Sequence, residues 1–188
     1  MLNTAEKIIS AGVLGFLFLL IYDLVSLKKL SDRFLFSLLG YSVQAYAVVR
    51  AACYDRRLML GSSLRCLAWP LMLSGLGWLL YCLFLYQPLR KTYFDRQGPV
   101  LTTEGPYALV RHPGVYGYTV FILALAVVCR SRLLLSAGSL WSLINIIYVF
   151  IQDRFIFPVL LVGYDEYRRH TPMLIPTAKS FRRFWATK

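Results

Sequence analysis

Long apolar runs are the feature that most restricts how this chain can fold. A helix needs about 20 mostly apolar residues to cross a membrane. Hydrophobic residues make up 58% of the chain, above the roughly 45–50% that is usual for a soluble domain. The runs are residues 8–27, 34–53, 66–86, 115–129 and a fifth that begins at Leu133. They predict an all-α, polytopic membrane helical bundle of about five transmembrane helices, forming a single membrane domain over residues 1–188.

The first run, residues 8–27, is predicted to form a transmembrane helix. It is as long as a membrane-crossing helix and has no small-residue cleavage pattern behind it, so we expect it to remain as the first helix. Asp23 lies near its end, close to Lys28 and Lys29. We interpret Asp23 as an interfacial carboxylate paired with a neighbouring lysine, with a buried functional acid as the alternative.

The charge balance is strongly basic, with 21 Lys and Arg against 9 Asp and Glu. These cations flank the apolar runs and do not form one stripe, which favours contact with membrane lipids and argues against a nucleic-acid partner. With the N-terminus outside, fourteen of the 21 cations fall on the inner side. The positive-inside rule therefore places the N-terminus outside and the loop near residue 112, together with the C-terminus, in the cytoplasm.

Metal and nucleotide motifs are not evident. The four cysteines have no Cys-x-x-Cys spacing, and the chain has neither a GxGxxG nor a Walker pattern. We therefore expect no metal site. The two histidines, His112 and His170, are far apart in sequence, which leaves a bis-histidine haem as a minor alternative.

Residues 101–117, LTTEGPYALVRHPGVYG, concentrate polar, cationic and turn-forming residues between apolar runs. Pro106 and Pro113 lack a backbone donor and bias the preceding residues away from helix, whereas the glycines permit turns and a close approach to a ligand. The pattern predicts a shaped loop that contains Arg111 and His112.

The end of the fifth run should lie beside this loop. Only residues 130–132 separate the fourth run from the fifth, so the two form an antiparallel hairpin. About 20 residues from Leu133 at 1.5 Å each bring the chain back across the membrane. We therefore expect Gln152, Asp153 and Arg154 to emerge next to His112.

Two more regions carry predictions about packing. Residues 155–176 should leave the bilayer and lie along its surface. Within them, Asp165 and Glu166 should form a salt-bridged face with Arg168 and Arg169. The basic tail, residues 177–188, suits an interfacial anchor on anionic lipid. In the bundle, Gln44 is expected to hydrogen-bond a neighbouring helix, and Gly75 and Gly77 to allow close helix packing.

The loop also resembles a known signature. Gly105-Pro106-Tyr107, followed by Arg111-His112-Pro113 and Gly117, is similar to the GPY…RHPxxxG pattern of the integral membrane methyltransferases. This family includes the isoprenylcysteine carboxyl methyltransferases and the phospholipid N-methyltransferases. Its acidic pair, spaced tyrosines and Pro-x-x-x-Pro resemble Gln152-Asp153, Tyr164, Tyr167 and residues 172–176. The resemblance covers residues 98–176, whereas the N-terminal helices in 8–86 carry no motif.

The resemblance implies a methyltransferase that uses S-adenosylmethionine, held in a C-terminal cytosolic cofactor-binding region, and methylates a lipid-like or prenylated acceptor. His112 or Asp153 would at most orient the nucleophile or accept a proton. Tyr164 and Tyr167 would contact the substrate, with interfacial packing as the alternative. The implied cofactor-binding residues are Gly105, Tyr107, Arg111, His112, Pro113, Gly117, Gln152 and Asp153.

Two departures from the pattern keep other functions open. Gln152 brings no negative charge where the family has an acid, and Val115 stands where an aromatic residue is usual. A non-catalytic membrane scaffold or partner-binding protein of the same fold is therefore one alternative. A membrane reductase that uses a nicotinamide cofactor is another. The acceptor atom is open among a carboxylate, an amine, a thiol and a phenol.

Overall fold

The computed structural model describes residues 2–28, 33–55, 58–86 and 101–186. All regular secondary structure in these ranges is helical, which confirms the all-α prediction. Residues 98–100 of the methyltransferase-like half and 187–188 of the tail lie outside the described ranges. The long elements are α1 (Thr4–Leu27), α2 (Arg33–Tyr54), α3 (Ser62–Leu80) with η1 (Tyr81–Tyr86), α6 (Gly114–Cys129), and α7 (Arg132–Ile151) with η2 (Gln152–Ile156). The short ones are α5 (Pro106–Leu109), α8 (Phe157–Leu160), α9 (Tyr164–His170) and α10 (Ala178–Ala186).

In the part of the chain that the structure describes, four helical segments are long and apolar enough to cross a membrane, which is compatible with a membrane protein. The segment predicted as the fourth of five spans, α6, is shorter. Its 16 residues reach about 24 Å at 1.5 Å per residue, less than the roughly 30 Å of a bilayer core. The four candidate spans are Thr4–Leu27, Phe34–Tyr54, Ser62–Phe84 and Arg132–Leu160.

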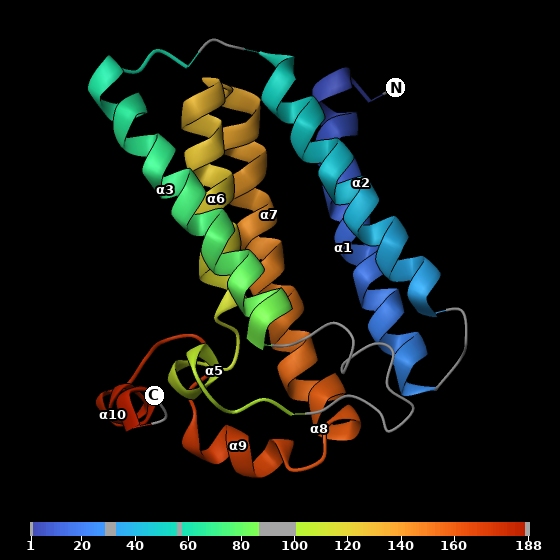
Figure 1. Ribbon diagram of the computed structural model, residues 1–188. Helices are drawn as coiled ribbons and strands as arrows, with labels where there is room; N and C mark the ends of the chain where they lie inside the picture. The colour runs from blue at the N-terminus through green and yellow to red at the C-terminus, as the bar shows by residue number, and fades with distance from the viewer. Residues whose placement is uncertain (1, 29–32, 56–57, 87–100, 187–188) are drawn as a thin grey trace.

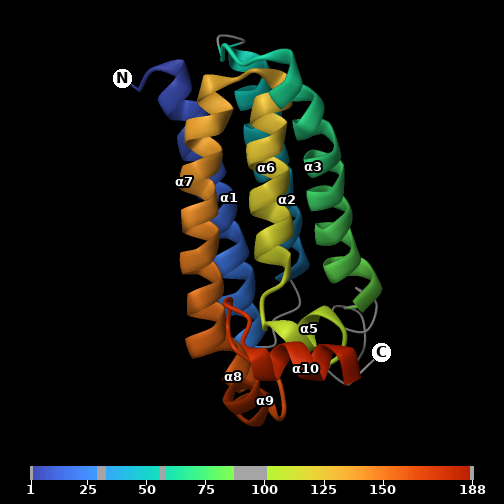
Figure 2. The same ribbon diagram turned by 90° about the vertical axis from the view of Figure 1, so that its left-hand side faces the viewer.

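The long helices run side by side, and the short ones gather at one end of the bundle (Figures 1 and 2). Helix α1 packs along α2, α3 packs along α6, and α7 contacts α6, α1 and α2. The N-terminus lies at the end opposite to α5, α9 and α10 (Figure 1). The predicted α6–α7 hairpin is therefore present, and it returns the chain to the end at which α6 begins.

Local capping signals explain where two of the helices begin. Helix α1 starts at Thr4, four residues before the predicted run, because Asn3 and Glu6 form a reciprocal capping box. In the hairpin, Arg130 adopts a left-handed conformation with φ 58°. The Ser131 hydroxyl then caps α7 by accepting a hydrogen bond from the Leu134 amide at 3.0 Å. Both signals are short-range and can be read from the sequence.

Glycines set the closest contact between α3 and α6. A Cβ atom on Gly117 would lie 2.7 Å from the backbone nitrogen of Leu79, and one on Gly75 would lie 2.6 Å from that of Phe121. Gly117, which the resemblance implicates in the cofactor site, thus lies in a helix contact. The packing prediction is confirmed for Gly75 and wrong for Gly77, whose Cβ position has no neighbour within 4 Å.

This contact generates a prediction about stability. Gly117→Ala forces a methyl group against the α3 backbone, which has no side chain to move aside, and should lower the free energy of unfolding by about 1–3 kcal/mol. Gly77→Ala is the matched control. It adds the same atom in open space and should leave stability unchanged or raise it by up to about 1 kcal/mol. Thermal unfolding in detergent measures both, and equal effects would contradict the close α3–α6 contact.

Candidate functional site

A buried ion pair joins the loop to the end of the fifth run. Arg111 Nε lies 2.6 Å from Asp153 Oδ1, and Arg111 Nη2 lies 2.8 Å from Asp153 Oδ2. The two side chains are only 8% and 7% exposed, and the pairing is bidentate, the strongest geometry available to a guanidinium and a carboxylate. The prediction that the region around residue 153 emerges beside the loop is confirmed.

Asp153 accepts two further hydrogen bonds. The Tyr164 hydroxyl donates to Oδ1 at 2.6 Å, and His112 Nε2 lies 3.3 Å from the same oxygen. Asp153 sits on η2, where the wider π-helical turn changes the direction of successive side chains. Both carboxylate oxygens are therefore occupied by protein donors, and Asp153 acts as the centre of a closed network.

Arg111 also holds the C-terminal end of α9. Its Nη1 donates to the carbonyl oxygen of Arg168 at 3.1 Å and to that of Thr171, groups that a helix end leaves without internal partners. Four of its five N–H groups are thus occupied by the protein. Burial lowers the pKa of Arg111, but the hydrogen bonds and charge of Asp153 outweigh it and raise the pKa, so the side chain stays charged.

Residues 171–174 run along the loop and accept hydrogen bonds from it in sequence. The amide of Arg111 donates to Pro172 O at 2.9 Å, and that of His112 donates to Met173 O at 3.2 Å. The Tyr116 hydroxyl donates to the carbonyl of Leu174. The proline-containing segment therefore serves as an acceptor strip, a role that does not need the amide hydrogen that proline lacks.

Glycine and proline shape the first part of the loop. Gly105 has φ 55° and ψ −131°, a backbone conformation essentially restricted to glycine. Pro106 then opens α5, where its missing amide hydrogen costs nothing. The Tyr107 hydroxyl donates to Cys82 O at 3.3 Å, and Pro113 O accepts from Trp78 Nε1 at 2.9 Å. The third helix thus holds both ends of the loop.

His112 is buried and neutral at pH 7. Burial lowers the pKa of His112 by more than the hydrogen bond and charge of Asp153 raise it. The ring stacks on Phe157, with centroids 5.7 Å apart and planes 15° apart. Because a carboxylate can only accept, Nε2 carries the proton and Nδ1 carries the lone pair. Within the described ranges, Nδ1 has no hydrogen-bond partner.

The two predicted substrate tyrosines are buried. Burial is the largest cause that raises the pKa of both Tyr164 and Tyr167 above the ordinary value, so both phenols stay protonated. Tyr164 donates to Asp153, and Tyr167 donates to the carbonyl of Tyr107 at 2.7 Å. The contacts of both residues are those of the packing alternative.

Gln152 points away from the loop and toward α1. Its Nε2 lies 2.9 Å from Asp23 Oδ2 and 2.8 Å from the Tyr148 hydroxyl. Asp23 is 4% exposed, and its partners in the described ranges are Tyr148 and Gln152. Asp23 is thus buried and does not pair with Lys28, as the buried alternative expected, and Lys29, the other predicted partner, lies outside the described ranges. A carboxylate within an apolar run was the sequence signal for the buried alternative.

An open groove of about 480 Å³ lies beside the loop. Glu166 on its wall pairs with His170 at 2.5 Å and with Arg169 at 3.3 Å. This confirms the predicted salt-bridged face for Glu166 and Arg169 and adds His170, whereas Asp165 and Arg168 form no ion pair in the described ranges. Arg183 donates to His170 O at 3.2 Å and joins α10 to this wall. The lining residues are Leu101, Thr103, Ala108, Gly163, Glu166, Tyr167, His170, Thr171, Arg183 and Ala186.

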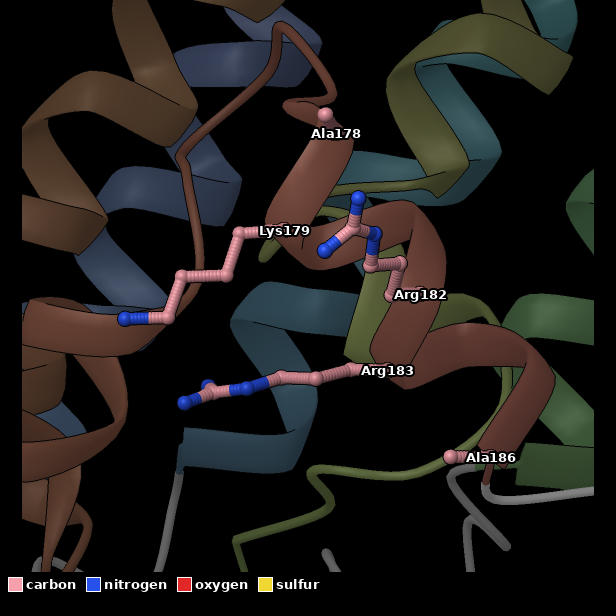
Figure 3. Close-up of a pocket in the computed structure, with 5 residues that line it drawn as sticks. All are labelled: Ala178, Lys179, Arg182, Arg183 and Ala186. Carbon is pink, nitrogen blue, oxygen red and sulfur yellow. The ribbon is translucent and has the colours of Figure 1, made fainter.

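Helix α10 presents cations and aromatic rings together. Lys179, Arg182 and Arg183 border a shallow depression of about 630 Å³, and Lys179 and Arg183 extend in the same direction (Figure 3). Phe181 and Trp185 are 51% and 59% exposed. Cations beside exposed aromatic rings on one short helix are typical of an interfacial membrane segment.

Among the described residues, the predicted cofactor-binding residues and the metal-ligating side chains do not form an open site. Within the described ranges, no three His, Cys, Asp or Glu side chains gather closely enough to hold a metal ion. Of the residues predicted to hold the cofactor, Arg111, His112 and Asp153 meet but bind one another, and none of them lines the groove. Comparisons with protein families, curated proteins and solved structures found no match.

The buried pair predicts strong coupling between its two members. Arg111→Ala leaves the Asp153 charge buried and unpaired, and Asp153→Ala does the same to the guanidinium. Each substitution should therefore lower the free energy of unfolding by about 3–5 kcal/mol. The double variant should lower it by at least about 2 kcal/mol less than the sum of the two single losses. Arg154→Ala, which removes an exposed cation from the same turn, should change stability by less than about 0.5 kcal/mol. Additive losses in detergent unfolding would contradict the pair.

Proposed function

We propose that the chain is an S-adenosylmethionine-dependent methyltransferase that acts at the membrane on a lipid-like or prenylated acceptor. The observation that carries the proposal is the Arg111–Asp153 pair. It joins the two parts of the sequence signature, the loop near His112 and the segment of residues 153–176, into one unit at one end of the bundle. This proximity supports the proposal that the two parts form one site.

The groove next to this unit fits the cofactor in size and chemistry. Its volume of about 480 Å³ lies within the roughly 300–1,000 Å³ of small-molecule sites. Glu166 would accept from ribose hydroxyls or an ammonium group by exchanging its exposed contacts with Arg169 and His170, and Arg183 would donate to a carboxylate. Leu101, Ala108 and the ring of Tyr167 offer an apolar wall for a base. The proposed cofactor-binding residues are therefore those of the groove.

The chain's own residues have distinct roles in this proposal. When bound, the cofactor supplies an electrophilic methyl group for an in-line displacement. Arg111 and Asp153 position the loop and the end of α9, and thereby exclude water from the reacting atoms. His112 is 7% exposed and lies outside the groove lining, so the proposal requires the acceptor to reach it; the lone pair on its Nδ1 then accepts the proton that an amine, thiol or phenol releases. A carboxylate acceptor would need no such base.

The closed network also favours a second candidate, a non-catalytic membrane scaffold of the same fold. Arg111, Asp153, Tyr164 and Tyr167 donate to or accept from one another or the backbone, as purely structural residues would. The two candidates differ at the groove, which a scaffold does not need.

Binding and transfer distinguish the candidates. Titration calorimetry of the detergent-solubilised chain should show saturable binding of S-adenosylmethionine and S-adenosylhomocysteine. Glu166→Gln should weaken both by about tenfold, the effect of one lost charge-assisted hydrogen bond, whereas the neighbouring exposed Asp165→Asn should not. His112→Gln should keep binding and lower methyl transfer to a membrane lipid extract by about 10²–10⁴-fold. No binding at millimolar cofactor by folded protein would leave the scaffold.

The orientation that we propose puts the groove and α10 in the cytoplasm and the N-terminus outside. The ends of the chain lie at opposite ends of the bundle (Figure 2), and the more cationic end should remain inside. Cysteines placed at Leu2 and at Lys179, in a chain with Cys53, Cys66 and Cys129 replaced by alanine, test this. A membrane-impermeant maleimide should label Leu2→Cys in intact cells and Lys179→Cys only after permeabilisation. The reverse pattern would overturn the orientation.

A further inference from the structure

A second buried carboxylate, Asp23, lies at the same end of the bundle as the Arg111 network. It belongs to the last part of α1, which packs against η2 and α8. Its Oδ2 accepts a hydrogen bond from the Tyr148 hydroxyl at 2.7 Å and another from Gln152 Nε2 at 2.9 Å. Gln152 Nε2 also donates to the Tyr148 oxygen at 2.8 Å, which closes a triangle of three donated hydrogens.

This geometry makes Oδ2 of Asp23 an acceptor. Both amide hydrogens of Gln152 and the hydroxyl hydrogen of Tyr148 are directed within the triangle, so Oδ2 receives hydrogens and gives none. The other oxygen, Oδ1, accepts no hydrogen bond from the described residues. The carboxylate is thus held by one oxygen and presents the other.

The charge of Asp23 is not compensated by the described residues. Asp153 has the bidentate guanidinium of Arg111, whereas no ion pair of Asp23 exists in the described ranges. Neutral donors stabilise a buried carboxylate but do not cancel its charge, and an unpaired buried charge costs several kcal/mol. In an apolar helix, such a residue indicates a functional site. If the role of residue 23 were only a polar contact between α1 and α7, a neutral asparagine would be sufficient.

The surroundings suit a cation that carries carbon groups. The Tyr148 hydroxyl contacts Asp23, and the Tyr148 ring lies 6.1 Å from that of Phe16, so one aromatic side chain lies beside the carboxylate. Aromatic faces attract cations, and more strongly when both are desolvated. A small inorganic ion would gain little from this ring.

We propose that Asp23 binds the cationic group of an organic ligand, an ammonium or a sulfonium, with Gln152 and Tyr148 as positioning residues. The ligand chemistry has two possible sources, the amine of a membrane amphiphile and the sulfonium of S-adenosylmethionine. Asp153 cannot take this role, because its oxygens already accept from Arg111, Tyr164 and His112. The proposal does not depend on methyl transfer. It requires only that the site prefers a cationic ligand to a neutral one.

The test uses two pairs of probes that differ in one charge. Dodecylamine, protonated at pH 7, is compared with dodecanol, and S-adenosylmethionine with its neutral thioether S-adenosylhomocysteine. The full chain in a neutral maltoside detergent should prefer the charged member of at least one pair by about tenfold or more, the size of one partly desolvated ion pair. Asp23→Asn should abolish this preference, and Asp165→Asn, the same change at an exposed position, should not.

A swapped pair separates charge from structure. Asp23→Asn with Gln152→Glu keeps one carboxylate and one amide in contact and should restore the preference for the cation. Gln152→Glu alone sets two carboxylates against each other and should lower the unfolding temperature. If Asp23→Asn does not fold, the swapped variant carries the comparison with the unmodified chain.

Each result decides the proposal. Loss of preference in the dodecylamine pair assigns the site to a membrane amine, and loss in the sulfonium pair assigns it to the cofactor. A preference that survives in folded Asp23→Asn, no preference in the unmodified chain, or none in the folded swapped variant would overturn it. The comparison of dodecylamine with dodecanol remains informative if the methyltransferase proposal fails, because neither probe is the cofactor.

Discussion

The bidentate contact between Arg111 and Asp153 is the interaction on which the end of the bundle that carries α5, α9 and α10 depends. The Arg111 side chain neutralises a carboxylate that the π-turn places inside the protein, and it also satisfies carbonyl groups at the end of α9. Residues 171–174 then lie along the loop and accept its hydrogen bonds. Without the ion pair, these segments would keep only backbone hydrogen bonds and those of single tyrosine hydroxyls.

This arrangement separates residues that hold the site from residues that can meet a ligand. The network around Asp153 is closed, since each carboxylate oxygen has protein donors. The carboxylate of Asp23 is different, because its Oδ1 accepts no hydrogen bond from the described residues, and the groove beside α9 is open to solvent. A binding or catalytic site needs such a rigid network beside it, because the network holds the ligand-contacting groups in place. It also explains how a sequence signature can contain residues that never touch a ligand.

Several predictions were right because they rest on short-range rules or on length. Apolar length predicts the long helices, and the three-residue link at 130–132 predicts the hairpin that brings Asp153 back to the loop. The capping pattern at Asn3 and Glu6 was readable but falls before the apolar run. Other residues were misassigned because their surroundings come from distant elements: Gly77 meets nothing within 4 Å, and Asp23 lies against Tyr148, 125 residues away.

By itself, the sequence determined an all-helical chain with long apolar segments and a glycine- and proline-shaped loop, because helix length and turn chemistry depend on neighbours in the chain. Only the tertiary structure decided the partners of the polar side chains. Gln152 and Asp153 are adjacent in sequence, yet one holds Asp23 and the other holds Arg111. The reason is geometric: on a helical turn, adjacent side chains point to different neighbours, and the packing of α1, α6 and α7 determines which neighbours those are.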